Sequence, residues 1–401
     1  MSTQAATAVA NERRDEKRAL GVACGAHALH DGYTDLIYVM LPVWQHEFAL
    51  SYAALGLMKT VFSGTLAAFQ IPSGFVAERF GAALILALGT AIAGLGYCLA
   101  GMSTGITLLV AALFVGGLGA STQHPLASSL VAHAFAGARS RKALGTYNFA
   151  GDIGKMAVPA TASLLLVVLP WRHALALLGG FGVLAAILIF IVTPGQSKGP
   201  AVVQKAQQGS GPAARHRIGF PLLLSVGVLD SATRMAFLTF LPFVLTAKGA
   251  SLPTIGLSLT LVFAGGAAGK LVCAFIGARI GTVATVWLTE AVTAAGIAAT
   301  LPLPLEATLV LLPIIGIALN GTSSVLYGSV PDLVTPERRT RAFGVFYTGT
   351  IGAGAVSPAI YGLVGDVVGV PVALMIVAGV VLLTLPITLA LRPALAQAMA
   401  A

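Results

Sequence analysis

The chain repeats its own pattern at an offset of about 200 residues, and this repeat is the strongest constraint on its fold. Leu-Pro pairs, glycines and arginines recur in register, with one residue fewer in the later part of the second copy. Matched positions include Leu41-Pro42 with Leu241-Pro242, Arg79 with Arg279, Gly81 with Gly281, Gly117 with Gly316, and Pro159 with Pro358. A duplication of this kind predicts two halves related by a pseudo-twofold axis.

The apolar content of the chain places both halves in a membrane. Of the 401 residues, 57% are hydrophobic and only 9% are charged, and the mean hydropathy is +0.91. So little charge cannot cover the surface of a soluble domain. Because about 20 apolar residues span a bilayer, we predict an all-α membrane protein with twelve transmembrane helices in two pseudo-symmetric six-helix bundles. The predicted spans are 19–45, 52–77, 82–102, 105–135, 142–168, 171–193, 219–246, 252–278, 282–302, 307–331, 341–364 and 370–391.

The predicted domain organisation follows from these spans. We expect a cytoplasmic N-terminal tail, an N-terminal six-helix bundle, a solvated cytoplasmic linker rich in Gly, Pro, Gln, Lys and Arg, a C-terminal six-helix bundle and a short cytoplasmic tail. Their predicted bounds are 1–18, 19–193, 194–217, 218–392 and 393–401.

The basic residues predict orientation rather than nucleic-acid binding. The formal net charge is +9, yet most of the 23 Lys and Arg residues lie in tails and loops of one side, whereas the opposite loops hold Arg172 and Lys248. The positive-inside rule then predicts that both termini lie in the cytoplasm, with the chain in a bacterial inner membrane. The first apolar stretch is long enough to span, so no cleavable signal is expected. All three cysteines lie in apolar segments, and we predict no disulfide, metal site or cofactor.

Two sets of motifs carry a resemblance to a known family. The segment from Gly74 to Gly81, with Glu78-Arg79 at its centre, resembles the G-x-x-x-D-R-x-G loop of the major facilitator superfamily, with Glu replacing Asp. His27-Ala-Leu-His30-Asp31 and His124-Pro125 resemble the H-x-x-N-D and His-Pro motifs of its fosmidomycin-resistance branch, with His30 in the place of Asn. The resemblance implies two six-helix bundles, a gate at Glu78 and Arg79, and proton-coupled efflux.

Ionisable side chains inside the predicted spans are candidates for function, because each costs about 2.5–3.5 kcal/mol to insert. Several of them can be paired. We predict the pairs Asp35–Lys59 and Lys270–Glu290 at equal depth on adjacent helices, and Asp152–Lys155 and Asp230–Arg234 along one helix face. Each pair is either a structural ion pair or part of the transport machinery.

The first span carries the strongest polar stripe. His27, Asp31, Asp35 and Tyr38 share one face of the predicted helix, and His30 lies beside it. If Asp35 pairs with Lys59, Asp31 has no obvious cation, and burial favours its neutral form. We therefore predict Asp31 as the leading proton carrier, with His27, His30 and Asp35 in the coupling group. The alternative is a protonated acid that only hydrogen-bonds a neighbouring helix.

A further set of residues is predicted to contact substrate. Arg234 and Lys155 are cations suited to a carboxylate or phosphonate. His124 precedes Pro125, which removes a backbone hydrogen bond, as in helices that line a cavity. Polar side chains that supply further hydrogen bonds are Asn148, Asn320, Tyr327 and Tyr38.

The sequence favours transport over catalysis. It contains no H-E-x-x-H, G-x-S-x-G or P-loop motif, so we predict neither an enzyme nor an ATP-driven pump. The prediction is a secondary transporter that exports a small organic anion or zwitterion by alternating access, coupled to protons. Import or exchange of a carboxylate or phosphonate is the alternative, and a membrane sensor without flux is the third possibility. The expected partners are the substrate, protons and lipid, and we expect a monomer.

Overall fold

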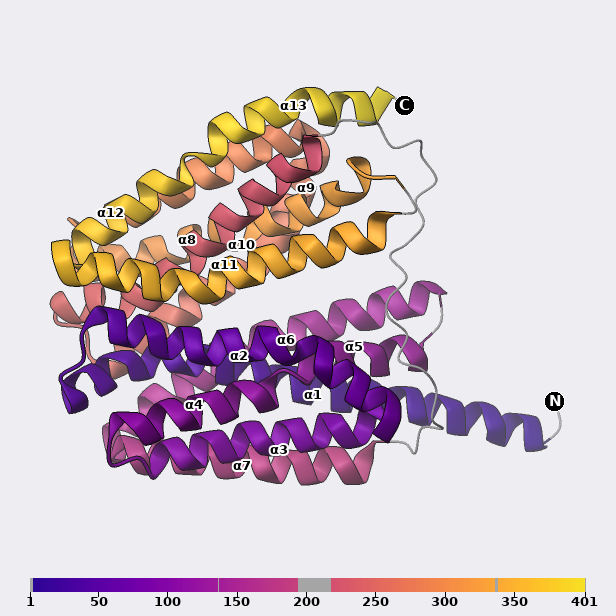
Figure 1. The fold of residues 1–401 in the computed structure, drawn as a ribbon. Coiled ribbons are helices and arrows are strands. Elements are labelled where there is room, and N and C mark those ends of the chain that lie inside the picture. The colour runs from indigo at the N-terminus through magenta and orange to yellow at the C-terminus, as the bar shows by residue number, and fades with distance from the viewer. Residues whose placement is uncertain (1–2, 136, 194–217, 336–337, 401) are drawn as a thin grey trace. The chain divides into compact units, whose positions relative to one another are not determined.

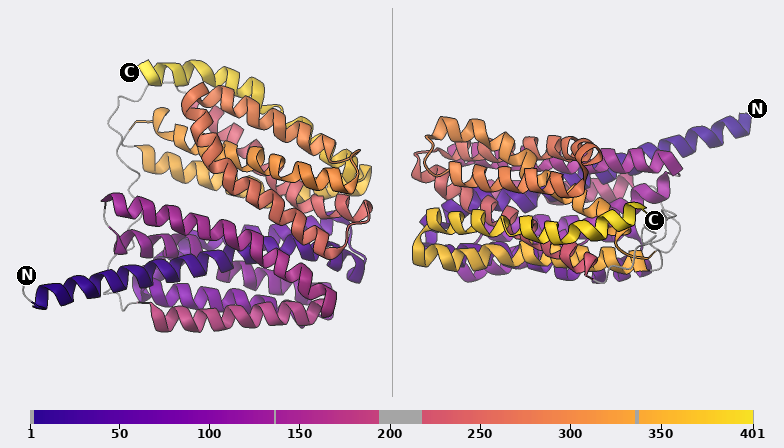
Figure 2. Two further views of the ribbon diagram at one scale, coloured as in Figure 1. Left: turned by 180° about the vertical axis from the view of Figure 1, so that it is seen from behind. Right: turned by 90° about the horizontal axis from the view of Figure 1, so that it is seen from above.

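The computed structural model describes residues 3–135, 137–193, 218–335 and 338–400, and every regular element in them is a helix (Figures 1 and 2). Their order along the chain is α1 Thr3–Phe48, α2 Tyr52–Phe80, α3 Ala82–Gly101, α4 Ile106–Ala120, α5 Gln123–Ala134, α6 Gly137–Val168, α7 Trp171–Val192, α8 Gly219–Ala247, α9 Leu252–Ala299, α10 Leu305–Ser329, the 3₁₀ helix η1 Val330–Asp332, α11 Arg339–Val368, α12 Val370–Val381 and α13 Thr384–Ala400.

These helices supply the predicted spans. Eleven segments of the described residues are long and apolar enough to cross a membrane. Helices α4 and α5 together form one of them, as do α12 and α13, whereas α9 contains two. The remaining predicted span, 19–45, lies within α1, where His and Asp side chains lower the hydropathy. The predicted fold class is therefore confirmed.

The outward faces of the helices are apolar, as lipid requires. Ile191 is 72% exposed, Leu271 is 77% exposed and Val367 is 84% exposed. Conversely, Asp31, Asp230 and other charged groups are buried. This pattern is the reverse of that in a soluble protein, where charged groups cover the surface.

The chain divides into two compact units. Unit 1 comprises residues Met1–Ile37 and Val61–Gln204, and unit 2 comprises Tyr38–Thr60 and Lys205–Ala401. The predicted linker 194–217 lies outside the described residues. Helix α1 begins at Thr3 and α13 ends at Ala400, so the described parts of both predicted tails are helical. The predicted bundle boundaries stay a prediction.

Glycines allow the helices of unit 1 to pack closely. A side chain at Gly94 of α3 would collide with the backbone at Gly179 and Val183 of α7, and one at Gly101 would meet Arg172 and its neighbours. Helices α3 and α7 therefore lie side by side (Figure 1). A core in this unit joins α1, α2, α3, α5, α6 and α7. It includes Ala23, Leu130, Tyr147 and Ile189.

The start of α2 is fixed within unit 2 by a carboxylate from α11. The backbone N–H groups of Tyr52 and Ala53 donate to Asp366 Oδ1 at 2.7 Å and to Oδ2 at 3.0 Å. The first N–H groups of a helix have no partner within the helix, and the helix dipole favours a negative charge there. Asp366 therefore caps a helix that lies far away in sequence.

The span predicted over 105–135 is interrupted just before Pro125, where the sequence predicted only a lost backbone hydrogen bond. Helix α4 ends at Ala120 and α5 begins at Gln123. Pro125 has no N–H to reach the carbonyl of Ser121, and this carbonyl accepts a hydrogen bond from Ser73 Oγ at 3.2 Å instead. The interruption determines where the next residue of interest, His124, projects from α5.

Matching glycines mark the repeat in the backbone. Gly81, between α2 and α3, has φ 97°, and Gly281, inside α9, has φ 82°. Only glycine adopts such angles without strain. The two turns correspond in sequence and in backbone conformation, which supports a duplicated architecture.

Candidate functional site

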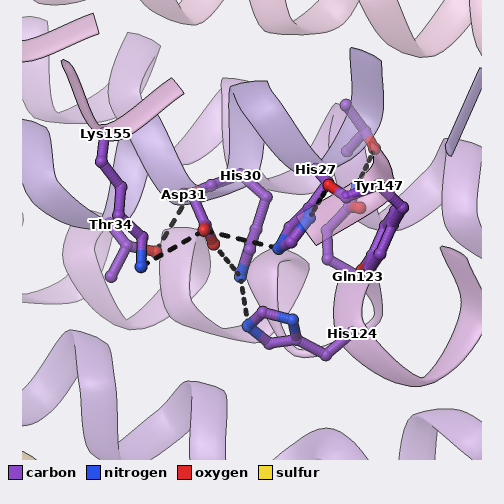
Figure 3. A network of polar contacts seen from close by, with 9 residues as sticks. His27, His30, Asp31, Thr34, Gln123, His124, Tyr147 and Lys155 are labelled. Atoms are coloured by element: carbon purple, nitrogen blue, oxygen red, sulfur yellow. Dashed lines mark hydrogen bonds and ion pairs between the residues drawn. The ribbon is translucent and has the colours of Figure 1, made fainter. Parts of the chain in front are cut away.

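Five ionisable side chains lie together in unit 1, three of them buried, and we call them the histidine–aspartate cluster. Three members come from α1, one from α5 and one from α6 (Figure 3). The members are His27, His30, Asp31, His124 and Lys155. Sequence reasoning proposed all five as site residues, and the structure brings them together.

Asp31 forms an ion pair with Lys155. The distance from Lys155 Nζ to Asp31 Oδ2 is 3.4 Å, and the side chains are 31% and 10% exposed. The expectation that Asp31 has no cation was therefore wrong. The physical reason lies in the packing of α6 on α1, where a side chain at Gly154 would overlap the backbone of Ala28 and one at Gly151 would meet Asp31 itself.

His27 is held in a defined orientation. Its Nδ1 donates to the backbone carbonyl of Tyr147 at 2.9 Å, and its ring stacks on the Tyr147 ring with centroids 4.1 Å apart. A carbonyl oxygen only accepts, so the proton of the neutral ring resides on Nδ1. The other nitrogen, Nε2, therefore faces Asp31 Oδ2 at 3.4 Å.

His30 and His124 extend the cluster toward an exposed surface. Their Nε2 atoms lie 3.3 Å apart, and His30 Nε2 lies 3.9 Å from Asp31 Oδ1. His27 and His30 are buried, whereas His124 is exposed. The five side chains thus connect a buried carboxylate with an exposed imidazole. Figure 3 shows Lys155 on one side of Asp31 and the histidines on the other.

A neutral pair lies beside the cluster, and sequence reasoning did not identify it. Gln123 Nε2 donates to Thr90 Oγ1 at 2.8 Å, and both side chains are buried. Neither side chain is ionisable, so a search for charged residues inside the apolar spans does not identify this pair. The adjacent residue, His124, is the one that reaches the cluster.

Unit 2 holds a second group of buried charges, which we call the carboxylate cluster. Glu290 of α9 lies within hydrogen-bonding reach of Asp230 of α8 and Thr322 of α10, and the charge of Arg234 acts on both carboxyls. Glu290 Oε1 and Arg234 Nε have no hydrogen-bond partner among the described residues. The sequence did not predict the contact of Asp230 with Glu290, and the pairing of Glu290 with Lys270 stays a prediction.

Tyr38 and Lys59, also of unit 2, lie together in its core. Lys59 Nζ lies 4.3 Å from the centre of the Tyr38 ring, and the Tyr38 hydroxyl donates to Met235 Sδ at 3.2 Å. Lys59 is 1% exposed and Tyr38 is fully buried. Asp35 belongs to unit 1, so its pairing with Lys59 stays a prediction.

The other predicted substrate residues lie in several places. Asn320 Nδ2 donates to the carbonyl of Gly316 at 3.2 Å, and the Tyr327 ring packs against Phe343 with centroids 4.7 Å apart. Asn148 is exposed on α6. Their contact with substrate stays a prediction.

The remaining predicted structural and gate residues were Asp152, Glu78 and Arg79. Asp152 is buried on α6, and the Asp152–Lys155 pairing stays a prediction. Glu78 and Arg79 are exposed near the end of α2, where the Arg79 guanidinium lies 5.6 Å from the Phe80 ring centre. Their role as a gate also stays a prediction.

Comparisons with known proteins agree with this architecture. The profile of the Major Facilitator Superfamily matches residues 23–228 and, in a second match, residues 223–398. The fosmidomycin resistance protein of Escherichia coli is 27% identical over 362 residues, which are 86% of each chain. A probable sulfoacetate transporter of Cupriavidus necator is 29% identical over 163 residues, which are 40% of this chain and 37% of the relative.

Solved structures show the same fold. A bacterial homologue of the human lysosomal transporter Spinster, in an inward-facing and unoccupied conformation, superimposes with a TM-score of 0.78. That match covers 96% of this chain and 98% of the other at 14% identity. The family match extends over both repeats and most of the described helices. The chain therefore belongs to the Major Facilitator Superfamily, whose members are transporters of small molecules rather than enzymes.

Proposed function

We propose that this transporter couples the movement of a small organic anion or zwitterion to protons by alternating access. The observation that carries the proposal is the ion pair of Lys155 with Asp31, with His27 at the same carboxylate oxygen. Relatives support an anionic substrate, since they include a probable sulfoacetate transporter and a 4-hydroxybenzoate transporter. Arg234 of unit 2 was also predicted to contact substrate, and that role stays a prediction.

The ion pair suggests how substrate and proton are linked. An anion that binds Lys155 competes with Asp31 for the same ammonium group. The displaced Asp31 carboxylate is then buried without its partner, and an unpaired buried charge is strongly disfavoured. Asp31 therefore takes up a proton, which His27 or His30 delivers. In this scheme the anion and the proton promote each other's binding, as reciprocal linkage requires.

The sign of this linkage sets the direction of transport. An anion that binds together with a proton moves together with it, so the inward proton gradient drives uptake. Uptake of an anion is thus the function that the ion pair supports best, ahead of the efflux that the sequence analysis put first.

Efflux of a zwitterion in exchange for protons is the second candidate. The cationic group of a zwitterion would take the place of Lys155 beside Asp31 and exclude the proton from it. Similarity to the Escherichia coli fosmidomycin resistance protein favours this candidate. We further propose an inner-membrane location with both termini in the cytoplasm, which the distribution of Lys and Arg supports.

Proteoliposomes that contain a pH-sensitive dye test the proposal. The membrane potential is clamped with potassium and valinomycin, and labelled sulfoacetate, 4-hydroxybenzoate or fosmidomycin is added outside. Co-transport acidifies the interior as substrate enters, whereas exchange makes the interior alkaline. Either change should vanish in Asp31→Asn and persist in Glu306→Gln, which removes an exposed acid far along the chain. Substrate uptake without any change in internal pH contradicts proton coupling.

A further inference from the structure

We propose that His27, His30, Asp31 and His124 form a binding site for a divalent transition-metal ion of the zinc type. One ligand atom each from His27, Asp31 and His124 lies within 4.8 Å of the others, and His30 Nε2 lies 3.3 Å from His124 Nε2 and 3.9 Å from Asp31 Oδ1. The sequence predicted no metal site, because only its cysteines were assessed as a framework. The inference is independent of proton coupling, since its test measures binding alone.

The distances in the cluster match a tetrahedral site. When bonds from the metal to nitrogen or oxygen are about 2.0–2.1 Å, two ligand atoms of a tetrahedron lie about 3.3–3.4 Å apart. His30 Nε2 and His124 Nε2 are separated by 3.3 Å, and His27 Nε2 and Asp31 Oδ2 by 3.4 Å. Both separations exceed the usual hydrogen-bond length of about 2.9–3.0 Å. A third separation, from His30 Nε2 to Asp31 Oδ1, is longer at 3.9 Å, so the carboxylate must turn toward His30 when an ion binds.

The orientation of His27 also suits a ligand. Metal-bound histidines donate their second ring N–H to a carbonyl or carboxylate, which fixes the ring and the tautomer. His27 Nδ1 makes such a bond to the carbonyl of Tyr147 at 2.9 Å. The lone pair of Nε2 is therefore available on the side of Asp31 and His124. Gly151 permits this arrangement, because a side chain there would collide with Asp31 and the His27 ring.

The donor set selects the class of ion. Three imidazoles and one carboxylate suit Zn²⁺, Co²⁺ or Ni²⁺, whereas Mg²⁺ and Ca²⁺ prefer oxygen ligands alone. Exposed His124 gives such an ion a route to the buried ligands.

Lys155 opposes metal binding. Its ammonium lies 3.4 Å from Asp31 Oδ2, so a metal ion must displace it from the carboxylate. The Lys155 side chain is 31% exposed and can turn toward solvent when this happens. Competition between Lys155 and the ion is therefore a specific consequence of this site, which adventitious binding at surface histidines would not show.

The test is titration of the purified full chain, carried on a tag without histidine, with Zn²⁺ and Co²⁺. Calorimetry measures affinity, and the visible absorption of Co²⁺ reports its geometry. We expect one Zn²⁺ per chain and the intense absorption of tetrahedral Co²⁺. His124→Gln should weaken binding by at least about 10- to 100-fold, the loss typical of even a second-sphere partner. His173→Gln, which replaces an exposed histidine outside the cluster, should have no effect.

Lys155→Met provides the opposite change and should tighten Zn²⁺ binding by about tenfold, since it removes the competing charge. It should also increase the rise in thermal midpoint that Zn²⁺ produces. Equal affinity in wild type, His124→Gln and Lys155→Met would overturn the proposal, as would octahedral Co²⁺ absorption in the wild type. Replacement of exposed His124 spares the core, so this comparison holds even where Lys155→Met folds poorly.

Discussion

The two clusters occupy related places in the repeat and differ in chemistry. Thr90 and Glu290 lie equally far beyond the matched glycines Gly81 and Gly281. In unit 1 this position carries a hydroxyl that accepts a hydrogen bond from Gln123 at 2.8 Å. In unit 2 it carries a carboxyl within reach of Asp230. The duplication has therefore kept the backbone turn, but the buried carboxyl that Glu290 adds in unit 2 has no counterpart at Thr90 in unit 1.

The matched helices α1 and α8 each carry a buried acid, whereas the other helices that carry charge do not correspond in the repeat. In unit 1 the carboxylate and its cation, Asp31 and Lys155, lie on α1 and α6. In unit 2 the acids Asp230 and Glu290 lie on α8 and α9, with Arg234 near both. Histidines join the acid in unit 1, as the members of its cluster show. The comparison teaches that proton chemistry is to be sought in unit 1, whereas unit 2 presents a cation beside two acids.

The largest effect is expected when the acid of unit 2 is placed in unit 1. Thr90→Glu would bury a carboxyl beside Gln123, at a position that is 3% exposed, with no cation placed for it. An uncompensated buried charge costs roughly 3–5 kcal/mol, so we expect little folded protein. The yield of monodisperse protein and the thermal midpoint measure this cost. The matched change Glu290→Thr keeps Asp230 beside Arg234 and should cost only about 1 kcal/mol. Equal yields for both variants would show that the repeats are interchangeable here.

A double-mutant cycle at Lys155 and Asp31 should give the next largest effect. Either Lys155→Met or Asp31→Asn alone breaks a buried pair, at a cost of roughly 2–3 kcal/mol once the partial exposure of Lys155 is considered. The double variant should lose less than the sum of the two. Thermal unfolding in detergent measures each corner of the cycle. Strict additivity would mean that the 3.4 Å contact contributes nothing.

The helix starts of the two repeats also differ, and Asp366→Ala tests this difference. Both starts are capped by their own serine, since Ser51 accepts from the Ala54 N–H at 3.2 Å and Ser251 from the Thr254 N–H at 3.4 Å, but only α2 has the added cap of Asp366 among the described residues. Loss of a cap costs about 1 kcal/mol, and Asp366 satisfies two N–H groups. We expect faster hydrogen exchange at the amides of Tyr52 and Ala53 in Asp366→Ala. Ser251→Ala should affect only the start of α9, and unchanged exchange at Tyr52 would remove the proposed cap.

The smallest effect is expected at Ser73, whose counterpart in the repeat is Cys273. Ser73→Cys introduces the unit 2 side chain and weakens the hydrogen bond to the Ser121 carbonyl that Pro125 leaves free. A net loss of about 0.5–1 kcal/mol is expected from a weaker donor at a buried carbonyl. A lowered thermal midpoint would support this account. A more stable variant would indicate that another group satisfies the carbonyl.

Hydropathy and the repeat were sufficient to predict the membrane fold. Each predicted span lies on a helix or helix pair, because lipid forces backbone hydrogen bonds to close within the segment. Pro125 likewise predicted a carbonyl without its helical partner, which is that of Ser121, since a missing N–H acts locally. Helical spans and the effect of a proline depend on residues that are neighbours along the chain, so they can be predicted without knowledge of tertiary packing.

The partners inside the site were harder to predict. Helical periodicity gives the face of α1 that bears Asp31, but it does not give the rotation of α6 against that face. Lys155 was therefore paired only with Asp152 on its own helix, and its ion pair with Asp31 was not predicted. A usable signal was present in Gly32, Gly151 and Gly154, whose lack of side chains permits α1 and α6 to approach closely. The contact of Asp230 with Glu290 has no comparable signal, because a common depth fits several pairings.

The cap on α2 has a consequence for the synthesis of the chain. Ala53 and Asp366 are 313 residues apart, and residues 38–60 belong to unit 2 although they leave the ribosome early. At about 5–20 residues per second, the start of α2 waits roughly 15–60 s for the carboxylate that caps it. During this interval the membrane insertion machinery, or water at the membrane surface, must satisfy the two amides. If the first half of the chain were expressed by itself, the N–H groups of Tyr52 and Ala53 would never receive the Asp366 carboxylate.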